Sequence, residues 1–371
     1  MRMTIEKQAA NACGFPESTE APPRDRANLL ACLHVQAYGC ARAGSPFYAA
    51  LLKRIGADVE AGGPTWNILG PYSAEPPVAA VALRFLGAVH RLVLEGRAPG
   101  LTLHYPSVGG DGDPDAAWAA LWTLLATHGP ALAPYLERPP QTNEVGRAAA
   151  LVGGFLTIAS ERNLPLHLLE IGASAGLHLR FDHYRYEAAD LAFGDPASPV
   201  RFAGLWEGTP PFDAACTVAV REGCDVDPVN PATEEGRLTV TSYVWPDQRD
   251  RLAALSGALE VAARVPANVE RADAPGWLAA KLAQPARGVA TVVFQSIVWQ
   301  YLSVEDQERV RLTIEEGGSR ATSDVPLAWL RFEPSADRMC CEVRLRSWPG
   351  RSDDRLLATA GYHGRPVRSL A

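Results

Sequence analysis

The stretch from Leu166 to Leu179, LHLLEIGASAGLHL, constrains the fold more than any other part of the chain. Its short and almost unbroken apolar run, Leu166 to Ile171, is typical of a strand that is covered on both faces in a parallel sheet. Gly172 and Gly176 then permit a tight turn and a close approach of the backbone to a ligand. We expect a helix after the turn, whose first amides would face an anion or a polar cofactor.

Two chemical motifs overlap in this turn. As E-x-G-x-S-x-G, residues 170–176 resemble the first motif of class I S-adenosylmethionine-dependent methyltransferases, with Ser174 where a glycine usually stands. As G-x-S-x-G, residues 172–176 match the nucleophile elbow of serine hydrolases. A third interpretation is a glycine turn that only joins a core strand to a helix. Other parts of the chain have to decide among the three.

Composition limits the partners of the chain. With 371 residues, 47% hydrophobic and 21% charged, it has the make-up of a globular protein with a sizeable core. The formal net charge of -7 gives no general attraction to nucleic acid or to an anionic membrane surface. We therefore expect a small-molecule substrate and neither a nucleic-acid nor a membrane partner, and the sequence leaves the oligomeric state open.

Cysteine usage and the start of the chain bear on its location. Seven cysteines are scattered without the CxxC pairs of a zinc site, so we expect reduced thiols and no bound metal. Residues 1–25 form a polar leader without the apolar centre of a signal peptide, and no apolar run is long enough to predict a membrane span. These features predict a cytoplasmic protein.

Residues 1–160 are predicted to form a mostly α-helical region. Helices are expected where apolar residues recur at helical spacing: from Arg26, from Pro46 behind a Ser45 cap, over 77–95, and from Pro114 behind an Asp113 cap. A last helical stretch, 139–162, is expected to open at Pro139-Pro140 with Thr142 as a cap.

Polar side chains crowd the start of that last stretch: Gln141, Thr142, Asn143, Glu144 and Arg147. Two interpretations carry equal weight. The group is an ordinary solvated helix cap, or it aims hydrogen-bonding groups at the ligand edge of the sheet.

Residues 161–371 are predicted to alternate strands and helices between 165 and 335, which favours right-handed crossovers and a largely parallel sheet. The β-branched segment 290–296 is its clearest later strand, and a helix over 303–316 follows Ser303. An insertion at 184–222 is expected to form a hairpin or a lid. Strands around Pro349-Gly350 should add a terminal antiparallel hairpin.

Polar residues end four of the predicted strands in chain order: Glu170, Asp225, Asp273 and Gln295. In a sheet of this kind, ligands bind beyond the carboxyl ends of the strands, at the switch point beside the first strand. A carboxylate on the second strand can accept both hydroxyls of a ribose, and one near the third can accept an adenine amino group. The order of these residues favours a nucleoside-containing cofactor.

With this order, residues 165–347 resemble the class I methyltransferase fold, a Rossmann-like α/β sheet with a terminal antiparallel hairpin. The segments LLEIGASAGL, QTNEVGR, SYVWPDQ and PLAWLR make almost the whole chain similar to the bacterial domain-of-unknown-function 2332 family. The methyltransferase resemblance implies S-adenosylmethionine as cofactor and methyl transfer to a small-molecule acceptor. The segment FQSIVW after the fourth strand lacks the Asn-Pro-Pro-Tyr type of motif, which disfavours DNA bases and glutamine as acceptors.

The same resemblance implies roles for individual residues. Cofactor contacts are expected from the glycine turn and the later strand ends, namely Glu170, Gly172, Ala173, Ser174, Gly176, Asp225, Asp273, Ala274 and Gln295. Glu187, Asp190 and Asp247 are alternatives to Asp225 at the ribose, because Asp225 lies 55 residues after Glu170. Substrate contacts at Asn143, Glu144 and Arg147 are expected on a different ground, which is only the density of polar residues before the first strand. If a base acts, the candidates are Glu144, His178 and Asp182.

Two other functions remain as alternatives. A serine hydrolase would use Ser174 with an acid and a later histidine such as His363, although Glu170 is unusual in the strand of a nucleophile elbow. We expect His363, after an antiparallel last strand, to lie away from the cofactor edge. A non-catalytic protein that binds a nucleotide-like ligand or a partner on the same fold is the second alternative.

Overall fold

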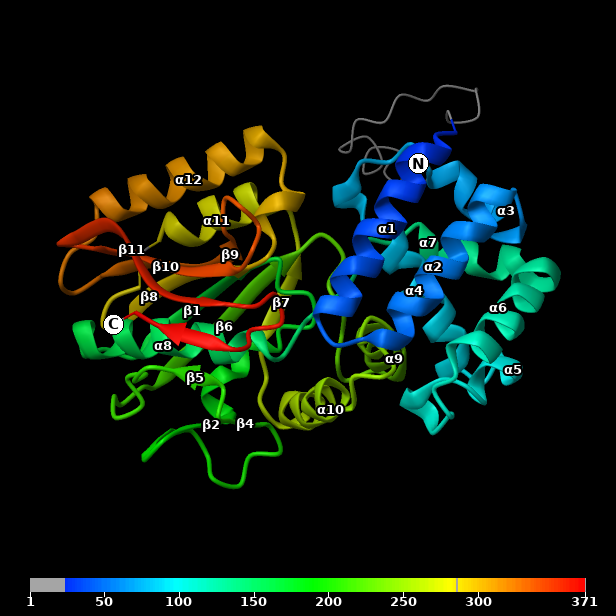
Figure 1. Cartoon of the computed structure of the whole chain (residues 1–371). Helices are drawn as coiled ribbons and strands as arrows, with labels where there is room; N and C mark the ends of the chain where they lie inside the picture. The colour runs from blue at the N-terminus through cyan, green and yellow to red at the C-terminus, as the bar shows by residue number, and fades with distance from the viewer. Residues whose placement is uncertain (1–23, 285, 371) are drawn as a thin grey trace, which may run out of the picture.

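The computed structural model describes residues 24–284 and 286–370, so residues 1–23 of the expected leader lie outside it. A helical region and a sheet region lie side by side (Figure 1). The helical region contains seven α-helices between residues 26 and 136: α1 (Arg26–Arg42), α2 (Pro46–Ala61), α3 (Pro64–Leu69), α4 (Val81–Leu94), α5 (Pro99–Thr102), α6 (Pro114–His128) and α7 (Ala133–Leu136). The expected caps form, since the side chains of Ser45 and Asp113 accept amide hydrogens from the first turns of α2 and α6.

The sheet region is built on nine strands in the spatial order β5-β12-β11-β10-β9-β8-β1-β6-β7. Five of them are parallel and form its centre: β1 (Leu166–Ile171), β6 (Val218–Asp225), β7 (Asn268–Arg271), β8 (Ala290–Ser296) and β9 (Leu327–Pro334). When these five strands are numbered by their order in the chain, their spatial order from β7 to β9 is 3-2-1-4-5. The direction of the strand order therefore reverses between β1 and β8. This is a topological switch point of the kind at which open α/β sheets bind ligands.

Helices cover both faces of this sheet (Figure 1). On one face lie α8 (Arg147–Arg162) and α10 (Arg249–Arg264), whose apolar side chains form one core with β1, β8 and β9. On the other face lie α11 (Ala274–Leu282) and α12 (Val304–Ser319), which form a second core with the opposite side of the same strands. The strand β1 is therefore buried on both sides, as its apolar run predicts.

One helix and one tryptophan connect the two regions. The helix α9 (Glu234–Ser242) packs against α4 of the helical region. Trp245, which follows α9, is buried in the core of the helical region. In contrast, α8 belongs by its packing to the sheet, although the sequence suggests that it ends the N-terminal region.

The expected insertion at 184–222 forms a small sheet of its own. Its three strands, in the order β3-β2-β4, are β2 (Arg185–Ala188), β3 (Leu191–Phe193) and β4 (Arg201–Ala203). A further short strand, β5 (Trp206–Glu207), pairs with β12 (Val367–Ser369) at the edge of the large sheet. The insertion ends before Val218, because the residues from there onward form the central strand β6.

The last strands form a meander. The strand β10 (Cys341–Trp348) is antiparallel to β9, and β11 (Arg351–Ala360) is antiparallel to β10, with the expected turn at Pro349-Gly350. Because β10 pairs directly with β9, β11 runs in the same direction as the five central strands. Its carboxyl end therefore points to the ligand edge. The expectation that His363 lies away from that edge is wrong for this reason.

Two predicted helices differ in the structure. The glycine turn is followed by a short 3-10 helix, η6 (His178–His183), and not by an α-helix. Residues 139–146 are not helical, since α8 begins at Arg147. In both places the backbone and side chains are hydrogen bonded to residues distant in the chain, and such partners replace the local bonds of a helix.

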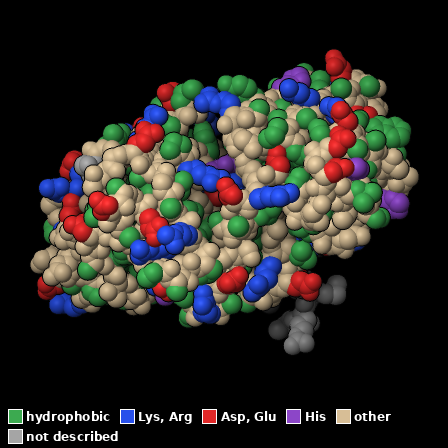
Figure 2. Space-filling view, turned by 60° about the horizontal axis from the view of Figure 1, so that its bottom comes forward, with side chains coloured by type: hydrophobic (Ala, Val, Ile, Leu, Met, Phe, Trp, Pro, Cys, Tyr) green, Lys and Arg blue, Asp and Glu red, His purple; other side chains and the backbone are tan. Residues whose placement is uncertain are grey.

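The molecular surface and one apolar helix bear on location. Figure 2 shows basic and acidic side chains interspersed over the face it presents. Contrary to the sequence expectation, the helical stretch Pro77–Leu94 is long and apolar enough to cross a membrane, but 67% of it is buried inside the protein. This burial identifies it as the core helix of the helical region.

Candidate functional site

The glycine turn after β1 has an unusual backbone. Gly172, Ser174 and Gly176 all have left-handed φ angles, of 68°, 51° and 65°. A Cβ atom on Gly172 would lie 2.3 Å from Cγ2 of Val298, and one on Gly176 would lie 2.9 Å from Cγ2 of Val269. Both glycines are therefore required by the close approach of neighbouring side chains as well as by their backbone angles.

Asp225 braces this turn from the end of β6. Its Oδ2 atom accepts a hydrogen bond from the backbone N–H of Ser174 at 2.9 Å, and its Oδ1 atom accepts one from the N–H of Asp227 at 2.9 Å. The parallel pairing of β1 with β6 brings these residues together although they are 51 positions apart. A carboxylate has about four lone-pair positions, so Asp225 retains capacity for a ligand.

The segment 139–146 lies against the other side of the turn. The hydroxyl of Ser174 donates to Oε1 of Gln141 at 2.5 Å, and Oδ1 of Asn143 accepts the backbone N–H of Leu177 at 2.9 Å. Gln141, Asn143 and Glu144 are all buried. Gln141 and Asn143 therefore direct hydrogen bonds at the glycine turn, on the ligand edge of the sheet, and this part of the polar group is not an ordinary solvated cap.

Glu170 and His178 form a buried pair beneath the turn. Oε1 of Glu170 lies 2.9 Å from Nδ1 of His178, and Nε2 of His178 lies 2.8 Å from the carbonyl oxygen of Glu144. Burial raises the pKa of the Glu170 carboxyl above its usual value. Within the described residues, the buried Oε2 atom of Glu170 has no hydrogen-bond partner.

Glu144 is tied to α10 by a buried ion pair. Its carboxylate contacts the guanidinium of Arg251, with Nε of Arg251 at 2.6 Å from Oε2. Burial alone would raise the pKa of Glu144, but the positive charge of Arg251 outweighs it and the pKa falls to about 2. Glu144 is therefore a permanent anion at neutral pH, which makes it a poor general base.

Arg147 lies at the carboxyl end of β8. Its Nη1 atom donates to the carbonyl oxygen of Ser296 at 3.0 Å, and its Nε atom donates to the carbonyl oxygen of Tyr362 at 3.2 Å. No carboxylate of the described residues lies within ion-pair distance of its guanidinium.

Ile297, which follows Ser296, has a left-handed φ of 54°, a rare conformation for a β-branched residue. No sequence signal indicated this backbone feature.

Other predicted site residues have structural partners. Asp273 caps α11 by accepting the N–H of Gly276 at 2.8 Å, with Ala274 buried behind it. The amide of Gln295 is bonded to Glu333 and Trp329 on the α11 face of the sheet.

The remaining acids lie apart from the turn or are already paired. Asp182 forms an ion pair with Arg221 at 2.6 Å. Of the alternatives for the ribose, Glu187 pairs with Arg185 and Arg201 in the small sheet, and Asp190 is exposed in its turn. Asp247 accepts hydrogen bonds from the hydroxyl of Ser45 and from the N–H of Phe47 at the start of α2.

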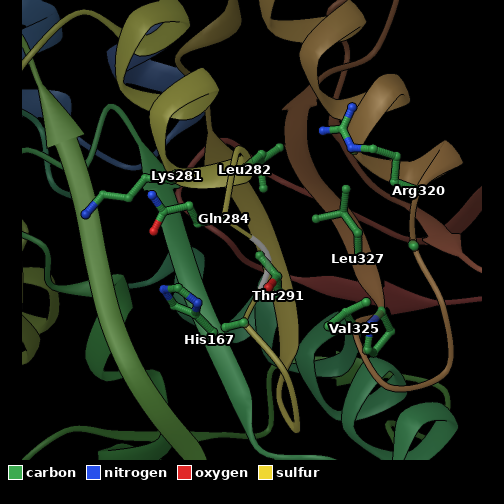
Figure 3. A pocket seen from close by; sticks show the side chains of 12 residues that line it. His167, Lys281, Leu282, Gln284, Thr291, Arg320, Val325 and Leu327 are labelled. Atoms are coloured by element: carbon green, nitrogen blue, oxygen red, sulfur yellow. The ribbon is translucent and has the colours of Figure 1, made fainter.

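Two cavities differ in size and position. One of about 270 Å³ lies between the helical region and the loop after β6, and Gln141, Asp227 and Arg271 are among its lining residues. A smaller one of about 40 Å³, lined by His167, Thr291 and Leu327, lies at the amino ends of β1, β8 and β9 (Figure 3). The larger cavity lies at the carboxyl ends of β6 and β7, where such sheets bind ligands. No sequence signal indicated this cavity, because its walls come from segments far apart in the chain.

A family model described as an uncharacterized protein conserved in bacteria (DUF2332) matches residues 31–368. The chain belongs to this family. No curated protein and no solved structure matches the chain. The match to the DUF2332 family begins in α1 and ends in β12, so the helical region and the sheet region are both part of the unit that defines the family.

Proposed function

We propose that the protein is an S-adenosylmethionine-dependent methyltransferase that acts on a small-molecule acceptor in the cytoplasm. The observation that carries the proposal is the 2.9 Å hydrogen bond from the N–H of Ser174 to Asp225. It brings the acid of the second strand next to the glycine turn of the first, at a switch point. The six free cysteines of the described residues are consistent with a reducing compartment.

The residues at the turn fit such a cofactor in part. The unpartnered Oε2 of Glu170 and the remaining lone pairs of Asp225 supply acceptors for the donors of an amino acid and of a ribose. Gly172, Ala173, Ser174 and Gly176 provide the backbone of the site. The remaining proposed contacts, Asp273, Ala274 and Gln295, fit less well, because Asp273 is occupied as a helix cap and Gln295 is bonded within the protein.

When bound, S-adenosylmethionine supplies an electrophilic methyl group on a sulfonium. The chain has to hold an acceptor in line with that methyl and exclude water, and such positioning supplies much of the rate. The expected acceptor contacts Asn143, Glu144 and Arg147 fit this role less well, because each is already bonded within the protein: Asn143 to Leu177, Glu144 to Arg251, and Arg147 to the carbonyl oxygens of Ser296 and Tyr362. Of the three candidate bases, Glu144 and Asp182 are ion paired, and both ring nitrogens of His178 are hydrogen bonded. We therefore assign no general base.

Calorimetry with S-adenosylmethionine and S-adenosylhomocysteine tests the proposal. We expect saturable binding of both, and a weakening of at least about tenfold in Asp225→Asn, since a lost hydrogen bond to a charged group costs about 1.5–3 kcal/mol. Arg368→Gln on β12, which removes an exposed ion pair with Glu207 of the edge strand β5, is the matched control and should bind normally. Absence of binding by the folded wild-type chain at millimolar ligand would refute the proposal.

A serine hydrolase is the weaker candidate. The hydroxyl of Ser174 donates to Gln141, and no histidine nitrogen of the described residues is hydrogen bonded to it. A nucleophilic serine requires an adjacent base. Labelling of Ser174 by a fluorophosphonate probe would support the hydrolase. Cofactor binding without transfer to any acceptor would favour the non-catalytic alternative.

A further inference from the structure

The cavity of about 270 Å³, which we call the inter-region cavity, has three walls. Arg91 of α4, Tyr135 of α7 and Arg138 come from the helical region, and the loop after β6 forms the wall of the sheet region. The helix α9 closes the third side together with Tyr243, the residue that follows it. Its volume is close to the lower end of the range for small-ligand pockets, about 300 Å³.

Gln141 connects this cavity with the glycine turn. It is only 5% exposed and lines the cavity, and its Oε1 atom accepts the hydroxyl of Ser174. Among residues 24–284 and 286–370, its amide nitrogen donates no hydrogen bond, and it is not one of the fully buried polar atoms that lack a partner, so it keeps some contact with solvent. The amide therefore has an unused donor, and this donor belongs to a residue of the cavity wall.

The three arginines of the cavity differ in how firmly they are paired. Arg91 is bonded to Glu95 and Glu235, and Arg271 lies 2.8 Å from Asp227. Arg138 has only a loose partner, with its Nη1 atom 3.8 Å from Glu235, which is already bonded to Arg91. Arg138 is therefore the cation most available to an anionic ligand.

Two tyrosines give the cavity an aromatic character. The ring of Tyr243 packs directly against Gly87, where a Cβ atom would come within 2.9 Å of it. The hydroxyl of Tyr243 is protonated at neutral pH, as that of an ordinary tyrosine is, and can donate a hydrogen bond. Tyr135 lines the cavity from α7. Aromatic rings of this kind pack well against planar groups.

We propose that the inter-region cavity binds the acceptor, and that the acceptor is a small molecule with a planar ring and a carboxylate or phosphate group. The ring lies between Tyr135 and Tyr243, the anion pairs with Arg138, and the amide of Gln141 donates to the ligand beside the turn. The identification of the ligand as the acceptor rests on the proposed methyltransferase function, whereas the binding of such a molecule does not.

Ligand-observed NMR on the full chain tests this proposal with three probes of the same shape: benzoate, phenyl phosphate and neutral benzamide. We expect millimolar or tighter binding of one or both anions and much weaker binding of benzamide. Tighter binding of phenyl phosphate would indicate a phosphorylated acceptor, and tighter binding of benzoate a carboxylate. Equal binding of all three probes, or binding of none, would overturn the proposal.

Two variants of the cavity wall and one control variant test whether the anionic probe binds in the inter-region cavity. Arg138→Gln and Gln141→Leu should each weaken the preferred anion by about tenfold, the cost of one hydrogen bond to a charged group. Arg309→Gln on α12, which removes an equally exposed arginine from an ion pair with Asp306, should leave the affinity for the probes unchanged. If Arg138→Gln binds the anion like Arg309→Gln does, the cavity is not the site.

Calorimetry with S-adenosylmethionine separates the two proposals. A chain that binds the anionic probes but not S-adenosylmethionine would keep the cavity as a binding site and refute the methyltransferase. A chain that binds S-adenosylmethionine but none of the probes would support the methyltransferase and refute the cavity as the binding site.

Discussion

Nδ1 of His178 lies 2.9 Å from Oε1 of Glu170, and each residue is only 1% exposed. Since Nε2 of the same ring faces a carbonyl oxygen, which can only accept, Nε2 must carry a proton. One further proton lies between Nδ1 and Oε1. The imidazole therefore fixes the glycine turn to the segment 139–146, and it is not free to act as a base.

Replacement of His178 by phenylalanine should be much more destabilising than replacement of Glu170 by glutamine. His178→Phe leaves a buried carboxyl without its partner, which costs about 3–5 kcal/mol of unfolding free energy. Glu170→Gln keeps an amide that can donate to Nδ1, so we expect a loss of about 1 kcal/mol. Urea unfolding at neutral pH measures both, and equal losses would contradict the assigned hydrogen bonds.

The ion pair of Glu144 with Arg251 should make the fold sensitive to acid. The pKa of Glu144 is about 2 in the folded protein and about 4.5 when unfolded, so its stabilisation is complete above pH 4.5 and is lost as the pH falls towards 2. The shift corresponds to about 3 kcal/mol. Glu144→Gln should show a flatter dependence of the unfolding free energy between pH 5 and pH 3. An unchanged slope in this variant would refute the assignment.

His363 should add a second pH dependence at milder acidity. Burial, followed by the charge of Arg251, lowers the pKa of His363 from 6.5 to about 3. The folded protein therefore binds this proton less readily than the unfolded chain, so the unfolding free energy is highest above pH 6.5 and decreases as the pH falls. Between pH 7 and pH 5 this effect lowers the unfolding free energy by about 2 kcal/mol. His363→Phe preserves the edge-to-face contact with Trp245 and should retain more of its neutral-pH stability at pH 5. Thermal unfolding at both pH values provides the comparison.

The close contact of Gly172 with Val298 can be measured by a double-mutant cycle. Gly172→Ala should cost about 2–4 kcal/mol, because it adds a left-handed backbone penalty and a methyl group 2.3 Å from Cγ2 of Val298. Val298→Ala removes that methyl and should recover about 1 kcal/mol or more of the loss as coupling energy. Additive effects of the two substitutions would show that the methyl group added at position 172 does not contact Val298.

Several elements could be predicted because their signals are local. The caps Ser45, Asp113 and Ser303 start helices as expected, since a capping side chain binds amides only two or three residues away. The strand 290–296 has the predicted bounds, because its β-branched run is apolar on both faces.

The wrong helix after the glycine turn and the wrong position of His363 both result from partners that are distant in the chain. The amide of Leu177 is bonded to Asn143 rather than within a helix, so the expected helix after the turn does not form. His363 reaches the ligand edge because β10 pairs directly with β9. Neither the register nor the order of strands can be deduced from the residues of one segment.

The buried first strand, its glycine turn and the acids at the strand ends could be predicted from the residues alone, because hydrophobic periodicity and turn chemistry act over a few residues. Which of those acids remain available to a ligand depends on the folded chain. Asp225 braces the turn with lone pairs to spare, whereas Asp273 is used as a cap. The reason is that a polar group is available only if no distant segment has satisfied its hydrogen bonds, and the packing of the whole chain decides this.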